Sequence, residues 1–591
     1  MTYRAPVADI VHAMRDVAGY DAAFGEGLYG DFDAATAAAA LDEAAKFAEE
    51  ALAPLDEIGD RHGVTLTDGA VTSAPGFADA YKAFAAGGWT AVVAPEAHGG
   101  MGMPGAFNAG CLEMWNAACL SFALCPLLSM GAIDALEAHG SEALRALYLP
   151  KLVSGEWTGT MNLTEPGAGS DLSDMKTRAT RAPDGTYRIV GQKIFITWGE
   201  HDMADNVVHL VLARLPDAPP GTRGISLFLA PKFIPGADGG PGRRNDLRCA
   251  GVENKLGIHA SPTCTMAYGD GGGATAWLIG EENKGLACMF TMMNNARLGV
   301  ALQGVAVGER AYQKALAFAR ERKQGRAAGA SGPGMSPIVE HPDVRRTLLA
   351  MKAQVGAARA ICHLTAAALD RARRAPDPAA AKRAADRAAL LTPIAKAYAT
   401  DVGVEVASQG VQVHGGMGFV EETGAARHYR DARILPIYEG TNGIQAIDLA
   451  IRKLPLADGA AVAAEIADIS SVADALRASN DPRWGRAPAR LDEALAALKR
   501  ATAYMAGAAK SAPESALAGA TDYLRLFALA RGAASLVHGA LALGARGEDD
   551  RARVEIARFH AEHHAPAAAG LADSVIDGAE ATLGASQALA S

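Results

Sequence analysis

The chain has 591 residues, half of them hydrophobic, with a formal net charge of −10 and a pI near 5.9. It contains no long run of Lys or Arg, so nucleic-acid binding has no electrostatic support. The 7 cysteines include no C-x-x-C pair, which argues against a disulfide framework or a zinc ribbon and suits a reducing compartment. The length allows about three to five domains, and the Ala-rich composition favours a large, mainly helical protein.

Neither targeting nor membrane insertion is indicated by the apolar stretches. The N-terminus carries Asp9 and Asp16 and lacks the continuous apolar region of a signal peptide. The most apolar stretch, around residues 288–307, is interrupted by Asn294, Asn295 and Arg297 and is no membrane span. The sequence therefore predicts a cytoplasmic protein.

Residues 1–159 are predicted to form an N-terminal helical domain. Apolar residues repeat at helical spacing between Leu41 and Leu55, and Asp33 precedes this run as a candidate cap. The glycine-rich segment at residues 99–105 could be a nucleotide-binding loop. It lacks the strand–GxGxxG–helix context of one, so we favour a connection between helices.

A β domain is predicted for residues 160–283. Residues 187–190 and 193–197 have strand composition and follow a turn at 184–185, and three further β runs lie at 207–212, 225–229 and 276–279. Pro/Gly-rich turns separate these runs. The pattern is typical of a small barrel or sandwich.

Helical spacing returns for residues 284–455 and predicts a bundle. One apolar face runs from Leu298 to Ala319 and another from Leu348 to Cys362, joined by a Gly/Pro/Ser-rich loop at residues 325–337. A charged, Ala-rich turn at residues 375–389 is expected before a long helix that runs toward Gln412. Long helices with short links favour a bundle.

Residues 456–591 are predicted to add a helical domain, with helix breakers at residues 480–482 and at Pro513. His560, His563 and His564 could be metal ligands, but they end a helix stopped by Pro566, where His favourably meets the helix C-terminus. No Asp, Glu or Cys set with metal spacing accompanies them, so we predict no metal site.

One carboxylate, Glu439, stands among apolar neighbours in the segment RILPIYEGTNGIQ at residues 433–445. A Gly follows it, and then a helical pattern begins. Desolvation in an apolar pocket raises the pKa of a carboxylate and makes it a base able to take a proton from carbon. Glu439 is therefore a candidate catalytic base, although the same pattern also fits a glutamate on a loop before a helix.

A second motif, MNLTEPGAGSD at residues 161–171, combines glycines, which allow close backbone approach to a ligand, with the hydroxyls of Thr164 and Ser170. Here the chain resembles the acyl-CoA dehydrogenase family. The TEPGAGSD string, the strand end at residues 195–197, the ERK string at 321–323, QVHGGMGF at 412–419, RDA at 430–432 and YEGT at 438–441 occur in that family's order and approximate spacing. The resemblance covers about residues 35–455.

This resemblance implies an α+β, mainly α fold: an N-terminal helical domain, a middle β-barrel domain and a C-terminal four-helix bundle, here with an additional C-terminal helical domain. FAD would lie between the β domain and the bundle and reach into a neighbouring subunit of a homodimer. The family's enzymes form a Cα=Cβ bond in an acyl-CoA thioester, as a glutamate removes the α proton and the β hydride passes to flavin N5. An electron-transfer flavoprotein usually reoxidises the flavin.

Position by position, the resemblance assigns the role of catalytic base to Glu439. Cofactor-binding roles along the flavin ring and its flanks fall to residues of the β domain, namely Met161, Leu163, Thr164, Gly169, Ser170, Phe195 and Thr197. Cofactor-binding roles in the bundle, partly across the dimer, fall to Arg322, Gln324, Gln412, Gly415, Gly416, Thr441 and Gly443. Substrate-binding roles fall to Ser170, Asn294, Arg297, Tyr438 and Gly440.

Four of the matching positions depart from the family's common pattern. Met161 replaces a frequent aromatic residue, Phe195 a frequent Trp, and His414 a frequent Phe. Gly443 stands where Gln or Ser–Gln is usual and offers no side-chain hydrogen bond. The base is intact, so these changes concern individual flavin contacts.

The length and several further strings resemble a long-form bacterial subfamily that includes 3-(methylthio)propanoyl-CoA dehydrogenase. These strings are GEW at residues 155–157, KLGIH at 255–259, MMNNARL at 292–298 and TNG at 441–443. The resemblance implies an acyl-CoA substrate, with 3-(methylthio)propanoyl-CoA as one candidate. Without a strongly basic amphipathic stretch, we expect a soluble homodimer.

Two alternative functions remain open from the sequence. An acyl-CoA oxidase of the same fold would pass electrons directly to oxygen, and sequence does not separate it from a dehydrogenase. A non-catalytic or nucleic-acid-associated flavoprotein could use the same scaffold, but the acidic charge and the intact Glu439 argue against it.

Overall fold

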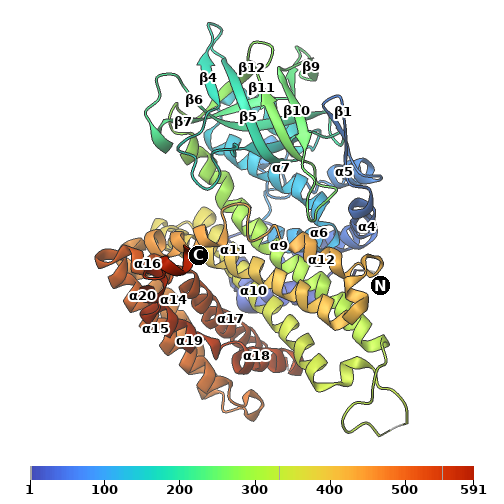
Figure 1. The fold of residues 1–591 in the computed structure, drawn as a ribbon, viewed down its shortest axis with the longest axis vertical. Coiled ribbons are helices and arrows are strands. Elements are labelled where there is room, and N and C mark those ends of the chain that lie inside the picture. The colour runs from blue at the N-terminus through green and yellow to red at the C-terminus, as the bar shows by residue number, and fades with distance from the viewer. Residues whose placement is uncertain (1–2, 332, 549, 591) are drawn as a thin grey trace. The chain divides into compact units, whose positions relative to one another are not determined.

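The computed structural model describes residues 3–331, 333–548 and 550–590, without the side chains of residues 294, 586 and 587. The described residues form two compact units (Figure 1). Unit 1 comprises Met1–Ala45, Gly105–Ala117 and Val300–Ser591, and unit 2 comprises Lys46–Pro104 and Ala118–Gly299. This division follows compactness alone, so the four predicted domain boundaries remain a prediction.

Unit 2 contains the β structure predicted from the sequence. Two short hairpins are formed by β1 (Thr65–Thr67) with β2 (Ala70–Thr72) and by β8 (Phe233–Pro235) with β9 (Pro241–Arg244). The remaining strands form one sheet: β3 (Trp157–Asn162), β4 (Arg178–Arg181), β5 (Tyr187–Thr197), β6 (Asn206–Arg214), β7 (Ile225–Pro231), β10 (Leu247–Val252), β11 (Thr263–Tyr268) and β12 (Ala274–Ile279).

The sheet closes on itself, as a barrel does. Its main path is β10-β11-β5-β12-β7-β6-β3, and β4 pairs with both β5 and β6. The strands β5, β12, β7, β6 and β4 therefore form a ring, and closure of this kind removes sheet edges. The predicted middle β-barrel domain is confirmed.

Strand β5 differs from the prediction of two separate runs. It continues through Gly191 and Gln192, because β11 pairs across both positions, Tyr268 with Gly191 and Ala267 with Gln192. Its first half pairs instead with β4 and β12. Residues 191–192, which were predicted to separate two strands, are the place where one continuous strand changes its pairing partner.

Helices pack around this sheet within unit 2: η2 (Ala48–Leu52), α4 (Ala53–His62), α5 (Phe77–Ala86), η3 (Glu96–His98), η4 (Gly221–Gly224), α7 (Leu120–His139), α8 (Glu142–Val153) and the first part of α9 (Gly285–Glu321). Helix α7 lies against β3 (Figure 1), where the Ser129 hydroxyl accepts from the N–H of Gly159 at 3.0 Å. Residues 99–104 connect η3 to the next helix, α6 (Gly105–Ala118), as expected.

Unit 1 is helical throughout its described residues. Its N-terminal and bundle helices are α1 (Val7–His12), η1 (Ala13–Val17), α2 (Tyr20–Gly25), α3 (Ala34–Phe47), α6 (Gly105–Ala118), the rest of α9, η5 (Ile338–Glu340), α10 (Pro342–Arg374), α11 (Pro378–His414), η6 (Gly415–Phe419), η7 (Glu421–Thr423), α12 (Ala425–Ala432), α13 (Asn442–Asp448) and η8 (Leu449–Lys453). Asp33 caps α3 as predicted, because its carboxylate accepts from the N–H of Thr36 at 2.7 Å.

The bundle is held by a close crossing of two long helices. A Cβ on Gly304 of α9 would lie 2.2 Å from the Ala399 carbonyl oxygen of α11, and one on Gly403 would lie 2.8 Å from the Gly304 carbonyl oxygen. Only glycine fits at such a distance. The expected turn at residues 375–389 is much shorter than predicted, because Asp377 caps α11 and the Ala-rich stretch after Pro378 is already helical.

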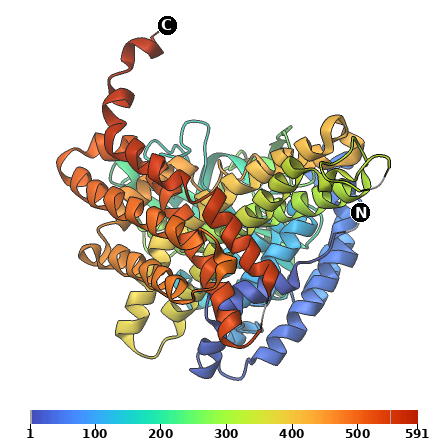
Figure 2. The ribbon, with the colours of Figure 1, turned by 90° about the horizontal axis from the view of Figure 1, so that it is seen from below.

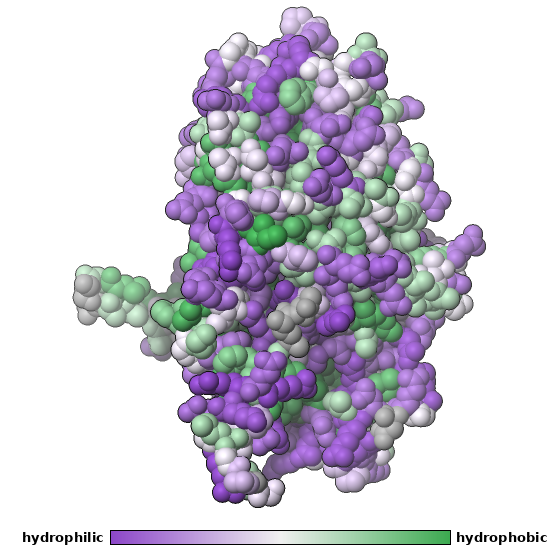
Figure 3. Space-filling view, turned by 90° about the vertical axis from the view of Figure 1, so that its right-hand side faces the viewer, coloured by the Kyte–Doolittle hydropathy of each residue, from purple (hydrophilic) through white to green (hydrophobic). Residues whose placement is uncertain are grey.

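The C-terminal residues form the additional helical domain that was predicted: η9 (Leu456–Gly459), α14 (Ala460–Ala478), η10 (Pro482–Trp484), α15 (Ala487–Ser511), α16 (Pro513–Ala518), α17 (Ala520–Ala545), α18 (Arg551–His563), α19 (Ala567–Asp577), α20 (Ala579–Leu583) and α21 (Ser586–Leu589). Figure 2 shows its long helices side by side. Helix α20 packs against α16 and α19, and the chain end beyond it projects from the rest (Figure 2 and Figure 3). Leu583 and Leu589 are exposed.

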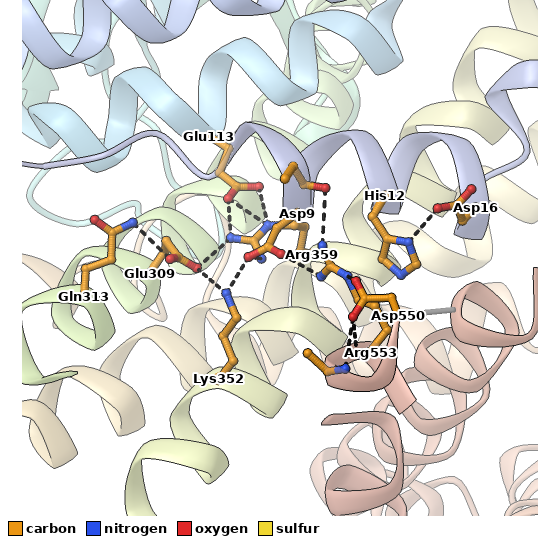
Figure 4. A network of polar contacts seen from close by, with 12 residues as sticks. Asp9, His12, Asp16, Glu113, Glu309, Gln313, Lys352, Arg359, Asp550 and Arg553 are labelled. Atoms are coloured by element: carbon orange, nitrogen blue, oxygen red, sulfur yellow. Dashed lines mark hydrogen bonds and ion pairs between the residues drawn. The ribbon is translucent and has the colours of Figure 1, made fainter. Parts of the chain in front are cut away.

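A network of buried charges joins α1 to the bundle and to the C-terminal domain (Figure 4). Arg359 of α10 donates to Glu113 at 2.7 Å and to Glu309 at 2.9 Å, and all three side chains are almost fully buried. Asp9 of α1 pairs with Lys352 and, at 2.6 Å, with Arg553 of α18. Such a network holds its elements together because any one charge left alone in this interior would be costly.

Two helices are long and apolar enough to span a membrane, among the residues that the structure describes. They are α7 and α17, and 83% and 78% of their apolar windows are buried inside the protein. Burial of this extent is what the core helices of a folded domain show.

Candidate active site

The loop that carries Glu439 lies between α12 and α13 and is built from tight turns. The N–H of Tyr438 donates to the Ile434 carbonyl at 3.2 Å, and the N–H of Asn442 donates to the Pro436 carbonyl at 3.0 Å. Glu439 has a φ of +55° and Gly440 a φ of +83°. A left-handed φ is unfavourable for a residue with a side chain, so the surrounding contacts must hold Glu439 in this conformation.

Two buried side chains bind the carbonyls of this loop. The Lys396 ammonium donates to the Gly440 carbonyl at 2.9 Å, and the Gln445 amide donates to the Gly440 and Glu439 carbonyls at 3.3 and 3.4 Å. Lys396 and Gln445 are both fully buried. The peptide groups that follow Glu439 are therefore held by donors from α11 and α13.

Asn442 connects the same loop to α11 a second time. Its amide nitrogen donates to Asp401 at 2.8 Å and to the Thr400 hydroxyl at 3.0 Å, and its amide oxygen accepts from Lys396 at 3.0 Å. Burial raises the pKa of the Asp401 carboxyl, and the Asn442 hydrogen bond opposes this rise. The Thr441 hydroxyl caps α13 by accepting from the N–H of Ile444 at 3.3 Å.

Tyr438, directly before the candidate base, is tied to the bundle. Its hydroxyl donates to the side chain of Gln303, a fully buried residue of α9. Burial raises the pKa of the Tyr438 phenol, and the negative charges of Glu439 and Asp431 raise it further. The phenol is therefore neutral near pH 7 and acts as a hydrogen-bond donor beside the base.

Unit 2 carries the residues expected along the flavin ring, and the structure brings most of them together. The turn at residues 163–170 follows β3 and lies along β5, where the N–H of Ile194 donates to the Thr164 carbonyl at 2.9 Å. The Thr160 hydroxyl donates to the Thr197 carbonyl at 2.7 Å. Met161, Leu163 and Thr164 are thus placed next to the strand end that contains Phe195 and Thr197.

A buried ion pair anchors this turn. The Lys193 ammonium of β5 donates to Glu165 at 2.8 Å and to the Leu163 carbonyl at 3.0 Å, and Glu165 also accepts from the N–H groups of Lys176 and Thr177. Burial lowers the pKa of Lys193 to about 8, partly offset by Glu165. Burial raises the pKa of Glu165, but Lys193 and these hydrogen bonds outweigh it and lower the pKa overall.

The surface beside the turn is open. Phe195 has a φ of +58° and leaves 58% of its surface exposed. Gly169 and Ser170 are exposed, and a Cβ on Gly169 would meet no atom within 4 Å. An exposed aromatic side chain, an open glycine and exposed hydroxyls are the groups with which a protein holds a flat, polar-edged ligand.

The bundle residues assigned to the cofactor lie at two helix ends of unit 1. Arg322 and Gln324 follow α9, both exposed, with the guanidinium donating to the Gln324 side chain at 3.4 Å. Gln412 lies in the last turn of α11, and Gly415 and Gly416 follow it with open space where a Cβ would lie. Gly443, in the first turn of α13, is likewise exposed.

The two remaining substrate positions lie on α9. Arg297, near the end of unit 2, is 6% exposed and therefore buried. The side chain of Asn294 lies outside the described residues. The structure thus groups the candidates into a turn-and-strand set in unit 2 and a loop-and-helix-end set in unit 1, each arranged within its own unit.

Sequence reasoning missed the side chains that hold both sets in place: Lys193 and Glu165 in unit 2, and Lys396, Asn442 and Gln445 in unit 1. The sequence does contain a pattern that could have indicated the two lysines. Lys396 stands in the apolar run LLTPIAKAYA at residues 390–399, and Lys193 stands in a strand that faces the core. A lysine in such surroundings requires hydrogen-bonding partners, because an isolated buried charge is unfavourable.

The histidines near the C-terminus form no metal centre. Among the residues that the structure describes, no group of three or more His, Cys, Asp or Glu side chains could hold a metal ion. His560 is fully buried, and the His563 ring stacks on Phe559 with 4.1 Å between ring centroids. These contacts are packing interactions.

Four family models match the chain in order. They are the acyl-CoA dehydrogenase N-terminal domain at residues 35–156, the middle domain at 160–270, the C-terminal domain at 283–454 and an acetyl-CoA dehydrogenase C-terminal-like domain at 462–586. Together they cover most of the chain.

Three similar proteins extend this comparison. The chain is 48% identical to 3-methylmercaptopropionyl-CoA dehydrogenase of Ruegeria pomeroyi over 526 residues, 89% of each sequence. The structure of acyl-CoA dehydrogenase complexed with FAD from Bacillus anthracis matches 94% of this chain and 89% of its own, with a TM-score of 0.75 and 21% identity, which shows a shared fold. A chain in the structure of the electron transferring flavoprotein of Acidaminococcus fermentans matches 71% of this chain and 98% of its own, with a TM-score of 0.58 and 26% identity.

Proposed function

The chain belongs to the acyl-CoA dehydrogenase family and is an FAD-dependent oxidoreductase that dehydrogenates an acyl-CoA, and we propose that Glu439 is its catalytic base. The observation that carries this assignment is the left-handed Glu439 backbone, whose following carbonyls are bound by Lys396 and Gln445. A strained residue held by buried donors is the kind of preorganised group that catalysis uses.

The residues present fit an FAD. Phe195 offers an exposed aromatic face, and the turn at residues 163–170 offers main-chain groups, the Thr164 and Ser170 hydroxyls and the open position at Gly169. In the bundle, Arg322 and Gln324 offer exposed donors suited to phosphate. Gln412, Gly415, Gly416, Thr441 and Gly443 would complete the binding residues.

When bound, FAD supplies the acceptor for the hydride that leaves the substrate β carbon. Glu439 takes the α proton onto its carboxylate. Negative charge then develops on the thioester oxygen, where the main-chain N–H of Glu439 would stabilise it as an oxyanion-hole donor. Gly440 leaves room for the thioester, and Tyr438, Ser170, Asn294 and Arg297 would contact the substrate.

We propose 3-(methylthio)propanoyl-CoA as the first substrate to test. The support is the 48% identity to the Ruegeria pomeroyi enzyme named for that thioester. An acyl-CoA oxidase reaction is the second candidate, because oxygen access to a flavin is not determined by the residues that bind it. Peroxide formation with an acyl-CoA as the only other reactant would favour it.

The decisive experiment is an anaerobic titration of the purified holoenzyme with a panel of acyl-CoAs, followed by absorption of the oxidised flavin. We expect bleaching, most complete with the preferred thioester. Glu439→Gln should retain FAD and bind acyl-CoA but bleach about 10²–10⁴-fold more slowly, because an amide cannot take the proton. Near-normal bleaching by Glu439→Gln would assign the base to another residue.

For the assembly we propose a soluble, cytoplasmic homodimer that passes electrons to an electron-transfer flavoprotein, with domains at residues 1–159, 160–283, 284–455 and 456–591. Support comes from the family, from the match to the Acidaminococcus fermentans structure and from the burial of the apolar helices α7 and α17. Gel filtration should give a dimer. Elution as a tetramer, or pelleting with liposomes, would contradict this assembly.

A further inference from the structure

A buried lysine stands directly behind the peptide that follows the candidate base. Lys396 is fully buried in the middle of α11, and its ammonium donates to the Gly440 carbonyl at 2.9 Å and to Asn442 at 3.0 Å. An ammonium is rarely kept in such a place, because its desolvation is strongly unfavourable. Its contacts therefore indicate what it is there to hold.

The two hydrogen bonds of Lys396 given above both lead to the loop of Glu439. Asn442 accepts from Lys396 and donates to Asp401 at 2.8 Å, so one amide links the buried cation to a carboxylate. Gln445 adds donors to the Gly440 and Glu439 carbonyls. The main chain after Glu439 is thus fixed from two helices, at the place where Glu439 has its left-handed φ.

We propose that Lys396, acting with Asn442, is a positioning residue for the proton-abstraction step: it fixes the Glu439–Gly440 main chain that carries the candidate base. This inference rests on the assignment of Glu439 as the base. It extends that assignment to a residue that contacts neither the proton nor the cofactor.

The charge balance around the loop allows this role. On the loop side, Tyr438 and Asp431 accompany Glu439, and α13 contributes the buried Asp448, which pairs with Arg452. On α11, Asp401 accepts from Asn442 at 2.8 Å, and Glu405 is paired at 2.7 Å with Arg525 of α17. Lys396 is the cation among these groups that donates directly to the loop main chain.

The main test compares Lys396→Met with the parent holoenzyme. The limiting rate of flavin bleaching should fall about 10²-fold, the loss expected when a reacting group moves by about 1 Å. The acyl-CoA concentration that gives half the limiting rate should change much less, because Lys396 binds the main chain beside the base. Loss of folded protein alone would lower the amplitude of bleaching and leave its limiting rate unchanged.

Lys352→Met is the matched control, because Lys352 is also a largely buried lysine of unit 1 and pairs with Asp9 away from the loop. It should lower the melting temperature and leave the limiting rate of bleaching unchanged. Asn442→Ala is the second variant if Lys396→Met does not fold. It removes the bridge from Lys396 to Asp401, so the limiting rate should fall here as well.

Hydrogen–deuterium exchange of residues 434–445 gives a readout independent of turnover. Lys396→Met and Asn442→Ala should both speed exchange in this segment, and Lys352→Met should not. Unchanged exchange in Lys396→Met would overturn the positioning role, whatever the result with acyl-CoA. A Lys396→Met holoenzyme with the parent's limiting rate of bleaching would overturn it as well. Failure of every acyl-CoA to reduce the flavin would instead contradict the proposed function.

Discussion

Single buried histidines couple this protein's stability to pH. His363 of α10 is fully buried, and neither ring nitrogen has a hydrogen-bond partner among the described residues. Burial lowers the pKa of His363 to about 3, with the nearby Arg359 charge acting in the same direction. Such a ring stays neutral in the folded protein at pH values where an unfolded chain would protonate it.

The sign of the effect follows from this difference. Below the unfolded pKa of about 6.5 the unfolded state binds more protons than the folded state, so stability falls as the pH falls toward 3. Between pH 7 and pH 4.5, the free energy of unfolding of His363→Leu should therefore fall less steeply than that of the parent, by about 1.4 kcal/mol per pH unit. Its melting temperature should also decrease less over this range. Calorimetric or fluorescence melts across this range measure it.

Cys362→Ala is the matched control, since Cys362 is the fully buried neighbour of His363 on the same helix. It removes packing without removing a group that binds protons in this range. Its melting curve should shift at all pH values by a similar amount. Equal pH slopes for His363→Leu and the parent would show that the ring is not the source of the linkage.

At this scale the sequence led to a proposal for the catalytic base but not to the residues that hold its loop. Glu439 could be proposed because an apolar flank around one carboxylate predicts a shifted pKa and because its motif matches a family. The role of Lys396 could not be proposed from the sequence, because the sequence does not show that its helix contacts a loop more than 40 residues later. The contact is a property of helix packing: Lys396 and Gly440 are 44 positions apart.

At the scale of elements, the turn at residues 163–170 depends on strand β5. Lys193 binds the turn both through Glu165 and through the Leu163 carbonyl. In Lys193→Met the turn should loosen and Glu165 should be left as a buried, unpaired carboxylate, a change that typically costs about 3–5 kcal/mol. The ratio of FAD to protein after gel filtration should fall, and the melting temperature should fall with it.

The double variant Lys193→Met with Glu165→Gln separates these two effects. It removes the unpaired charge, so much of the stability should return. The bond to the Leu163 carbonyl is still absent, so FAD content should stay low. Full recovery of FAD content in the double variant would mean that the ion pair contributes only stability and that the turn holds its shape without Lys193.

The elements themselves were predictable where local patterns decide them. Asp33 could be predicted as an N-cap because a carboxylate before an Ala-rich helix accepts hydrogen bonds from the N–H groups of the first turn. The full length of strand β5 and the start of α11 could not be predicted, because each depends on an interaction with another residue or strand. Gly191 and Gln192 are held in one strand by pairing with β11, and the charged residues after Pro378 follow a cap at Asp377.

At the scale of the molecule, the order of helical, β and helical parts was readable from the changing periodicity of the chain, and the four-part layout followed from the family resemblance. The charge network of Figure 4 could not be predicted from the sequence. Its members lie on α1, α6, α9, α10 and α18, and Glu113 and Arg359 are 246 positions apart. No local pattern marks a glutamate in an apolar helix as the partner of an arginine so far along the chain.

The contacts of the first helices also set an order of events during synthesis. Asp9 pairs with Arg553, and Asp16 with Arg546, which lies 530 positions later in the chain. At roughly 5–20 residues per second, a ribosome needs about half a minute to two minutes to make the chain between them. The earliest segment to emerge therefore lacks these two arginine partners until almost the last segment has been made.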